Sequence, residues 1–294
     1  MRALYDVPAP AKLNLFLHIT GRRADGYHLL QSVFMLIDWH DSLHLEVTQN
    51  GGITRQDLNS QAPALPADDL IVRAARALQA ATGCTQGAHI ALDKQIPAQA
   101  GMGGGSSDAA STLLALNRLW GLGLSRRELA AIGLQLGADV PFFIGGSNAW
   151  VEGIGEQITA LEGEYTLPGA RFAVLKPDAG LDTRGIFTSP LLKRDTERAT
   201  IADFAANHFD FGRNDLQPVA EALCPDVKKA IDWLEALGLQ ARMTGSGSAV
   251  FAQIKQADFP TTRLTPPRDW TIKVCENLPR HPLKEWVADE RTTG

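Results

Sequence analysis

The segment Gly101-Met-Gly-Gly-Gly-Ser-Ser-Asp108 decides the fold, because it joins two segments whose apolar residues follow different periods. Residues 89–96 (HIALDKQI) alternate between polar and apolar, as a half-buried strand does, and Pro97 ends them. Residues 109–120 (AASTLLALNRLW) instead repeat their apolar positions at helical spacing. The glycines therefore connect a strand to the start of a helix.

A glycine-rich turn that leads into a helix is a general phosphate site. Glycine lets backbone N–H groups approach an anion, and the first helical turn adds unpaired donors and partial positive charge. A flexible linker, the alternative, would not need these flanks. Ser106 follows Gly105 where a Walker A loop has lysine, and Ser106 also replaces the third glycine of a dinucleotide fingerprint starting at Gly101. We predict a phosphate site of neither type, to which Ser106 and Ser107 could add hydroxyls.

The composition fits a globular protein of about two domains. The chain has 294 residues, 45% hydrophobic and 21% charged, and domains span roughly 100–200 residues. The net charge of −5 excludes a nucleic-acid binder that relies on a basic surface. No apolar run approaches the ~18–20 residues that cross a bilayer, and the N-terminus has neither a signal core nor an Arg/Ser-rich leader. We expect no membrane span and a cytoplasmic location.

Cysteine and histidine spacing argues against a disulfide framework or a zinc site. The three cysteines form no CxxC pair, and no HExxH motif occurs. Strands are followed by helices in each half, which favours α+β layers over a TIM barrel. The rhythm changes around residues 155–170, where EGEYTLPG reads as a linker. We expect one domain over residues 1–158 and a second over 159–294.

Three further features could carry chemistry. Lys12 stands beside Asn14 in a strand that is otherwise apolar, where a lysine reaching out from an edge is the alternative. Asp139 follows a helix and precedes Val-Pro, where it could equally be a turn or capping residue. Residues 244–248 (TGSGS) form a second glycine loop between expected strands, which alone would indicate only a tight hairpin.

Three separated blocks resemble one enzyme family, the GHMP kinases (galactokinase, homoserine kinase, mevalonate kinase and phosphomevalonate kinase). They are PAPAKLNLFL at 8–17, PAQAGMGGGSSDAAS at 97–111 and MTGSGSAVFA at 243–252. The motifs RADGYH at 23–28 and LGADVPF at 136–142 resemble most closely a branch that phosphorylates the 2-hydroxyl of a cytidyl diphosphate sugar alcohol, in the non-mevalonate route to isoprenoids. The resemblance spans about residues 8–252.

The resemblance implies an N-terminal ATP-binding domain with a left-handed βαβ crossover and a C-terminal ferredoxin-like domain. It implies that Asp139 is the catalytic base, with Lys12 beside it, and that ATP acts with Mg²⁺, whose ligands we leave unassigned. It implies that ATP binds at Asp69, Leu70, Lys94, Gly101, Gly103, Gly104, Gly105, Ser106 and Ser107. It implies that the substrate binds at Asn14, Tyr27, His28, Thr183, Phe187, Gly245 and Gly247, with the two aromatic rings and His28 around the base.

Two other functions remain open from the sequence. The first is a mevalonate or homoserine kinase, which the pairing of the RADGYH motif with Phe187 disfavours because neither substrate has a base to stack. The second is a sugar-kinase-like sensor without turnover, which the presence of both Lys12 and Asp139 disfavours. The sequence leaves the choice between a monomer and a homodimer open.

Overall fold

The structure is a computed structural model of the chain, and it describes residues 2–59, 65–267 and 269–290. The strands are β1 (Ala3–Arg22), β2 (His28–Thr48), β3 (Ile53–Asp57), β4 (Gly87–Asp93), β5 (Ala149–Glu152), β6 (Gln157–Ala160), β7 (Arg171–Lys176), β8 (Ala241–Met243), β9 (Val250–Ile254) and β10 (Thr271–Glu276). The helices are α1 (Leu70–Thr82), α2 (Gly104–Leu119), α3 (Arg126–Leu134), α4 (Val140–Gly145), α5 (Thr183–Thr188), α6 (Ile201–Ala205), α7 (Gln217–Leu223) and α8 (Pro225–Ala236). Short 3₁₀ turns lie at Gly163–Tyr165, His208–Asp210, Thr261–Arg263 and Lys284–Trp286.

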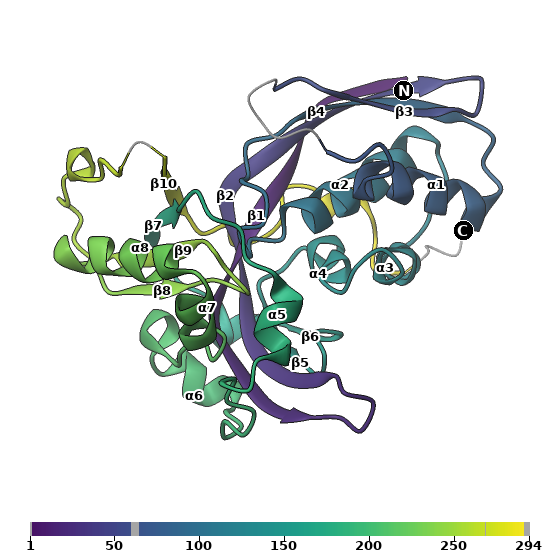
Figure 1. Cartoon of the computed structure of the whole chain (residues 1–294). Helices are drawn as coiled ribbons and strands as arrows, with labels where there is room; N and C mark the ends of the chain where they lie inside the picture. Colours follow the sequence, from purple (N-terminus) through teal and green to yellow (C-terminus); the bar gives the residue numbers. More distant parts are fainter. Residues whose placement is uncertain (1, 60–64, 268, 291–294) are drawn as a thin grey trace.

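A long antiparallel hairpin of β1 and β2 runs through both lobes of the molecule (Figure 1). At one end, Leu43 and Leu45 of β2 are buried in the core of the N-terminal lobe, and at the other, Leu17 and Ile19 of β1 are buried in the core of the C-terminal lobe. The register shifts after Pro10 and again after Asn14. Such irregularities bend a strand and redirect its side chains, so the hairpin turns at the junction of the lobes.

The N-terminal lobe is a sheet covered on one side by helices. Its strand order is β3-β4-β2-β5-β6, with β1 paired to β2. Strands β3 and β4 are parallel neighbours connected through α1, which makes them the βαβ unit expected from the resemblance. Asp69 caps α1, and Ser125 and Glu128 form a capping box at α3.

The C-terminal lobe has the strand order of a ferredoxin-like domain. Its antiparallel sheet runs β10-β7-β9-β8, so the first and third strands in chain order lie in the middle. Helices α5 to α8 lie between β7 and β8, whereas the link from β9 to β10 contains only the 3₁₀ turn at Thr261–Arg263 among its described residues. The α+β class and the ferredoxin-like arrangement are therefore confirmed. Within the part of the chain described, no helix has the length and apolar character to span a membrane.

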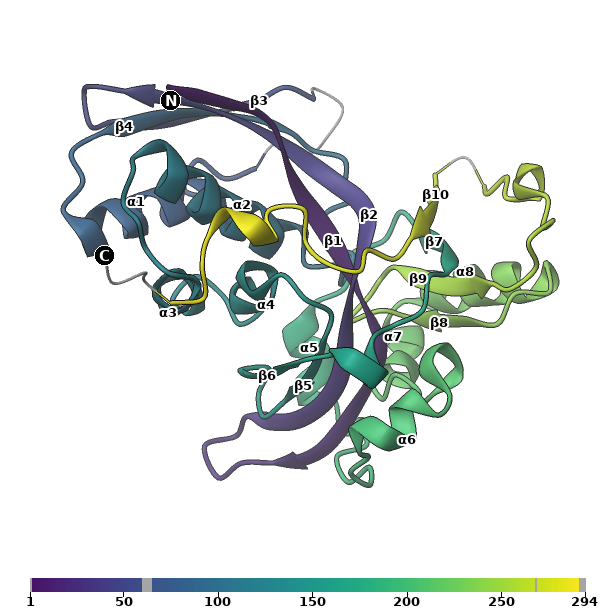
Figure 2. The ribbon, with the colours of Figure 1, turned by 180° about the vertical axis from the view of Figure 1, so that it is seen from behind.

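The C-terminal segment after β10 returns to the N-terminal lobe (Figure 2). Leu283 is buried in the core of that lobe, and Trp286 packs against it. The Arg126 guanidinium at the start of α3 donates to the carbonyls of Lys284 and Val287 at 2.6 and 2.9 Å. The domain boundary between residues 158 and 159 stays a prediction. The C-terminal segment, although it follows the second lobe in the chain, packs on the first lobe.

Candidate active site

The phosphate loop enters α2 earlier than the sequence predicts. The helix begins at Gly104, so Gly104, Gly105, Ser106 and Ser107 form its first turn rather than the preceding loop. Gly103 is the N-cap with φ of +70°, a conformation open to glycine, and it turns the chain directly into the helix. Across the described residues the N–H groups of Gly104, Gly105 and Ser106 have no acceptor. They are the donors that an anion would meet.

Ser107 supports the loop from beneath. Its hydroxyl is buried and donates to the carbonyl of Pro10 at 2.7 Å, while its N–H donates to the Gly103 carbonyl at 2.9 Å. Ser106 is only partly buried, and its hydroxyl would lie 3.6 Å from a Cβ placed at Gly137. Of the two serines, Ser106 therefore has its hydroxyl free for a ligand, and a direct ligand role for Ser107 stays a prediction.

The second glycine loop is the β8–β9 hairpin, and it closes against the first. A Cβ on Gly101 would overlap the carbonyl oxygen of Thr244 and lie 2.9 Å from the Gly247 nitrogen. A Cβ on Gly245 would lie 2.6 Å from the Gly101 oxygen. Gly101, Gly245 and Gly247 also have positive φ. Glycine is therefore required on both sides of this contact, which joins the two lobes.

Lys12 and Asp139 face each other at this junction. Lys12 Nζ lies 3.7 Å from Asp139 Oδ2, with the lysine side chain 4% exposed and the aspartate side chain 30% exposed. Lys12 is therefore not a lysine that reaches out from an edge. Asp139 is the N-cap residue of α4, yet its carboxylate makes no capping hydrogen bond. Burial lowers the pKa of Lys12, and the charge of Asp139 opposes that effect only in part.

Asn14 fixes Lys12 and connects it to the second loop. Lys12 Nζ donates to the Asn14 side-chain oxygen, and the Asn14 amide donates to Ser32 Oγ at 2.9 Å. The Asn14 backbone N–H donates to the hydroxyl of Thr244 at 2.8 Å. The Lys12 ammonium also lies 4.7 Å from the centre of the Phe34 ring. These contacts hold the ammonium close to the N-terminus of α2.

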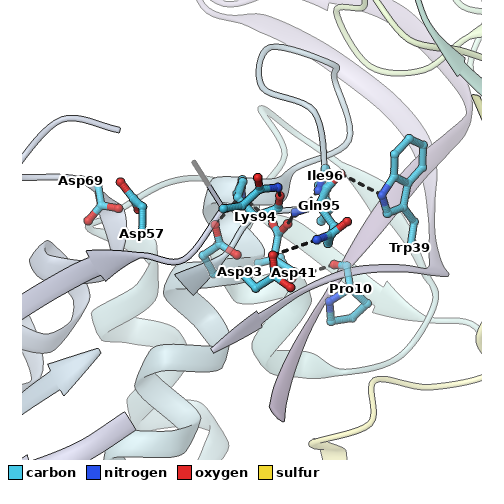
Figure 3. Close-up of polar contacts among 12 residues, drawn as sticks. Pro10, Trp39, Asp41, Asp57, Asp69, Asp93, Lys94, Gln95 and Ile96 are labelled. Atoms are coloured by element: carbon cyan, nitrogen blue, oxygen red, sulfur yellow. Dashed lines mark hydrogen bonds and ion pairs between the residues drawn. The ribbon is translucent and has the colours of Figure 1, made fainter. Parts of the chain in front are cut away.

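Lys94 is held by two buried carboxylates (Figure 3). Its Nζ lies 2.6 Å from Asp41 Oδ2 and 2.6 Å from Asp108 Oδ2. The other oxygen of Asp41 accepts the N–H groups of Gln95 and Ile96 at 2.5 and 2.7 Å. A Cβ on Gly104 would lie 3.3 Å from Lys94 Nζ, so this ammonium lies directly under the first turn of α2.

One ammonium cannot balance two buried carboxylates. Asp108 is 2% exposed, and no described residue hydrogen-bonds its Oδ1. Burial raises the pKa of Asp108, and Asp41 adds to that effect while Lys94 opposes it. Burial lowers the pKa of Lys94, but Asp108 and Asp41 outweigh it, so the lysine pKa is raised. The raised pKa of Lys94 and the raised pKa of Asp108 are consistent with each other, because two carboxylates share one ammonium.

Asp69 and Leu70 lie at the start of α1, near the phosphate loop. Asp69 Oδ1 accepts the Val72 N–H at 3.0 Å, and its Oδ2 pairs with Arg55 at 3.0 Å. Leu70 Cδ1 would lie 3.4 Å from a Cβ placed at Gly105, so this side chain touches the first turn of α2. The Asp69 carboxylate is therefore occupied by protein donors, and Leu70 offers an apolar surface beside the loop.

Three of the predicted substrate residues line one cavity of about 690 Å³: Tyr27, His28 and Phe187. The Tyr27 side chain is largely exposed, and the His28 and Phe187 ring centres lie 5.2 Å apart at 39°. Arg22 and Arg184 line the same cavity. The structure thus brings these residues together at the far end of the β1–β2 hairpin. Thr183 lies outside this wall, where its hydroxyl shares a 2.8 Å hydrogen bond with Ser246 of the second glycine loop.

Several residues around the site carry no signal in the motifs. Arg194 contacts His28, and Arg22 and Arg184 bring positive charge to the cavity. The sequence does contain a feature that marks Asp41. It is a charged residue two positions from each of Trp39 and Leu43, which are apolar and buried. Among the described residues no group of three or more His, Cys, Asp and Glu side chains could hold a metal ion.

Comparison with known proteins gives the family. The N-terminal domain of the GHMP kinases matches residues 69–147, and the C-terminal domain matches residues 192–258. A 4-diphosphocytidyl-2-C-methyl-D-erythritol kinase of Paracidovorax citrulli is 68% identical over 99% of this chain and 100% of its own. The enzyme of the same name from Delftia acidovorans is 67% identical over 99% of each chain.

Solved structures agree with these matches. The crystal structure of a 4-(cytidine 5'-diphospho)-2C-methyl-D-erythritol kinase covers 91% of this chain and 98% of its own, with a TM-score of 0.76 and 31% identity. A homoserine kinase from Cytophaga hutchinsonii covers 96% of both chains with a TM-score of 0.69, and at 16% identity it supports the fold alone. The chain therefore belongs to the GHMP kinases, within the family of the 4-diphosphocytidyl-2-C-methyl-D-erythritol kinases.

Proposed function

We propose that this protein phosphorylates the 2-hydroxyl of 4-diphosphocytidyl-2-C-methyl-D-erythritol with ATP as donor and Mg²⁺ as cofactor. One observation carries the proposal. The structure combines a lysine–aspartate pair, a helix N-terminus whose N–H groups at 104–106 have no acceptor among the described residues, and a cavity lined by Tyr27, His28 and Phe187. Relatives with that activity in their names match 98–99% of the chain at 67–69% identity.

The lysine–aspartate pair supplies the proton transfer. Asp139 is part-exposed and makes no capping bond, so its carboxylate is free to accept the proton of the attacking hydroxyl. The Lys12 ammonium lies 3.7 Å from it and favours its ionised form. As the phosphoryl group moves, the same ammonium balances negative charge in a site where burial strengthens that attraction.

The first turn of α2 holds the phosphates. The N–H groups of Gly104, Gly105 and Ser106 and the partial positive charge of the helix face the donor. The donor set fits a magnesium ion that is held mainly by phosphate oxygens, because Ser106 offers a hydroxyl with no partner among the described residues. Once bound, Mg²⁺ would neutralise phosphate charge.

Base recognition separates this activity from that of mevalonate and homoserine kinases. The cavity offers two aromatic rings, Tyr27 and Phe187, for stacking and an imidazole for hydrogen bonds. Arg22 and Arg184 bring positive charge beside it, which suits the diphosphate of the substrate. The proposal places the enzyme in the cytoplasm, as a monomer or homodimer. Its three cysteines are free, as in a reducing compartment.

A coupled assay of ADP release tests this function. The wild-type protein should release ADP with the cytidyl substrate only when ATP and Mg²⁺ are present, and should not do so with mevalonate or homoserine. ADP release with either of those two compounds, and none with the cytidyl substrate, would overturn the proposal. Absence of release with all three would support the sensor instead.

A further inference from the structure

Arg194, in the segment after α5, makes a directed contact with the substrate histidine. Its Nε–H donates to His28 Nε2 at 2.9 Å. Its Nη groups donate to the carbonyls of Leu192 at 3.0 Å, Phe187 at 3.2 Å and Ser189 at 2.7 Å. Three backbone acceptors therefore fix the plane of the guanidinium. The Nε–H is aimed at the imidazole by the fold of this segment.

This contact decides which nitrogen of His28 holds the proton. A guanidinium has donors only, so the nitrogen that faces it must act as an acceptor. The neutral imidazole then has its proton on Nδ1, because only one ring nitrogen is protonated in that form. Burial lowers the pKa of His28, and the positive charges of Arg194 and Arg22 lower it further, so the shift favours the neutral ring.

Among the described residues the Nδ1–H of His28 has no acceptor. His28 packs against Phe187 and lines the cavity of about 690 Å³, and for its Nδ1 no partner exists among residues 2–59, 65–267 and 269–290. The charged groups around the ring are Arg194 in the segment after α5, Arg184 on α5, Arg22 at the end of β1 and Asp25 in the turn that follows. An unpaired donor thus borders a cavity that has room for a base.

We propose that Arg194 is a positioning residue that locks His28 in its Nδ1–H form, and that this N–H selects cytosine over uracil. The inference rests on the proposed function, since it takes the cavity to hold a pyrimidine. Cytosine presents an acceptor at N3, whereas uracil presents an N–H there. Against the locked histidine, uracil would set two donors face to face, and each would lose its partner on leaving water. The other tautomer would favour uracil.

The wild-type protein by itself offers the first test. Nitrogen-15 NMR of the histidine rings, assigned with His28→Gln, distinguishes a protonated from an unprotonated ring nitrogen. At pH 7 we expect His28 to show the proton on Nδ1 and none on Nε2, with CDP present or absent. A proton on Nε2 of His28 would overturn the inference, and so would a ring protonated on both nitrogens at pH 7.

The second test compares three arginine variants by competition of CDP and UDP against the cytidyl substrate. In Arg194→Met the preference for CDP over UDP should fall roughly tenfold, because that is the typical difference between making one hydrogen bond and leaving its donor unpaired. The pKa of His28 should rise. Arg194→Lys keeps a positive donor and should recover part of the preference. Arg198→Met is the matched control, because Arg198 is 66% exposed and pairs with Glu152. It should leave the ratio unchanged.

The outcomes separate this inference from the function on which it rests. If wild-type protein shows no ADP release and binds neither CDP nor UDP, the proposed function fails. If wild type prefers CDP and Arg194→Met keeps that preference with His28 still protonated on Nδ1, the function stands and the role of Arg194 fails. Equal loss of CDP and UDP binding in Arg194→Met, with the ratio intact, would make Arg194 only a structural support.

Discussion

Two lysines lie against the start of α2, and they differ in whether their charge is available to a ligand. Lys12 has one carboxylate at 3.7 Å, and burial lowers its pKa. Lys94 has two carboxylates at 2.6 Å each, and their pull raises its pKa in spite of burial. The positive charge of Lys94 is therefore neutralised by Asp41 and Asp108 within the protein. The charge of Lys12 is only partly neutralised by Asp139, so it remains available to a ligand.

The difference shows how one fold can use one lysine for structural stability and another for catalysis. A cation that is fully paired keeps its neighbours in place, and its removal leaves unpaired buried charge. A buried cation that is incompletely paired costs stability, and it gains a partner when an anionic ligand or transition state arrives. Activity and stability should therefore respond in opposite ways at the two lysines.

The largest effect should come from breaking the Lys12–Asp139 pair. For Asp139→Asn and for Lys12→Met we expect turnover to fall by ~10²–10⁴-fold, the usual contribution of a positioned acid–base group, with ATP still bound. Because the two residues act as a unit, the double variant should lose far less than the product of the two losses. Steady-state ADP release measures turnover, and calorimetry measures ATP binding.

Asp226→Asn is the matched control, since Asp226 is 41% exposed and pairs with Lys229 on α8. Its turnover should equal that of wild type. A loss of tenfold or less in Asp139→Asn would make Asp139 a turn residue after all. Losses that multiply in the double variant would mean that the two residues do not work as a pair.

Lys94→Met should give the largest loss of stability. It would leave Asp41 and Asp108 buried without their cation, and breaking a buried pair in this way costs about 3–5 kcal/mol. Urea unfolding at pH 7 measures the free energy. Lys228→Met, which removes a pair exposed at 61% and 53%, should leave the free energy of unfolding close to that of wild type, because solvent screens such a pair. Equal losses in the two variants would refute the supporting role of Lys94.

Lys12→Met should barely change stability, although it strongly reduces turnover. Since burial lowers the pKa of Lys12, the folded state holds that proton less firmly than the unfolded chain. The charged lysine thus costs stability, which wild type regains as the pH rises through the lowered pKa. Asp139, at 30% exposed, can be hydrated once Lys12 is gone. We expect a loss of no more than about 1 kcal/mol in urea unfolding; a loss as large as that of Lys94→Met would erase the contrast.

The smallest effect should come from Asp108→Asn. The pKa of Asp108 is raised, so its ionised form reduces stability above that pKa, and wild type gains stability as the pH falls through it toward the value of the unfolded chain. The variant lacks this titration. It should equal wild type at pH 7 or exceed it by about 1 kcal/mol, and this advantage should shrink in acid. A pH-independent loss in urea unfolding would show that Asp108 is an ordinary ion-pair partner.

Local patterns predicted the elements of the site well. The cap at Asp69, the capping box at Ser125 and the glycine entry into α2 depend on residues within four positions of each other, so spacing reveals them. The start of α2 was placed too late, because glycine is a poor helix former and nothing local indicated that Gly104 and Gly105 would be helical. The family resemblance, rather than periodicity, supplied Tyr27, Phe187 and the ferredoxin-like domain.

The sequence by itself determined the α+β class, the phosphate loop, the glycines that allow the chain a positive φ, and the identity of the groups available for catalysis. The tertiary structure decided which charges meet. Lys94 pairs with Asp41 across 53 positions, and His28 with Arg194 across 166. Such partners leave no spacing signal, because the chain between them can have any length. Burial, which sets how firmly each charge is held, exists only after the lobes have packed.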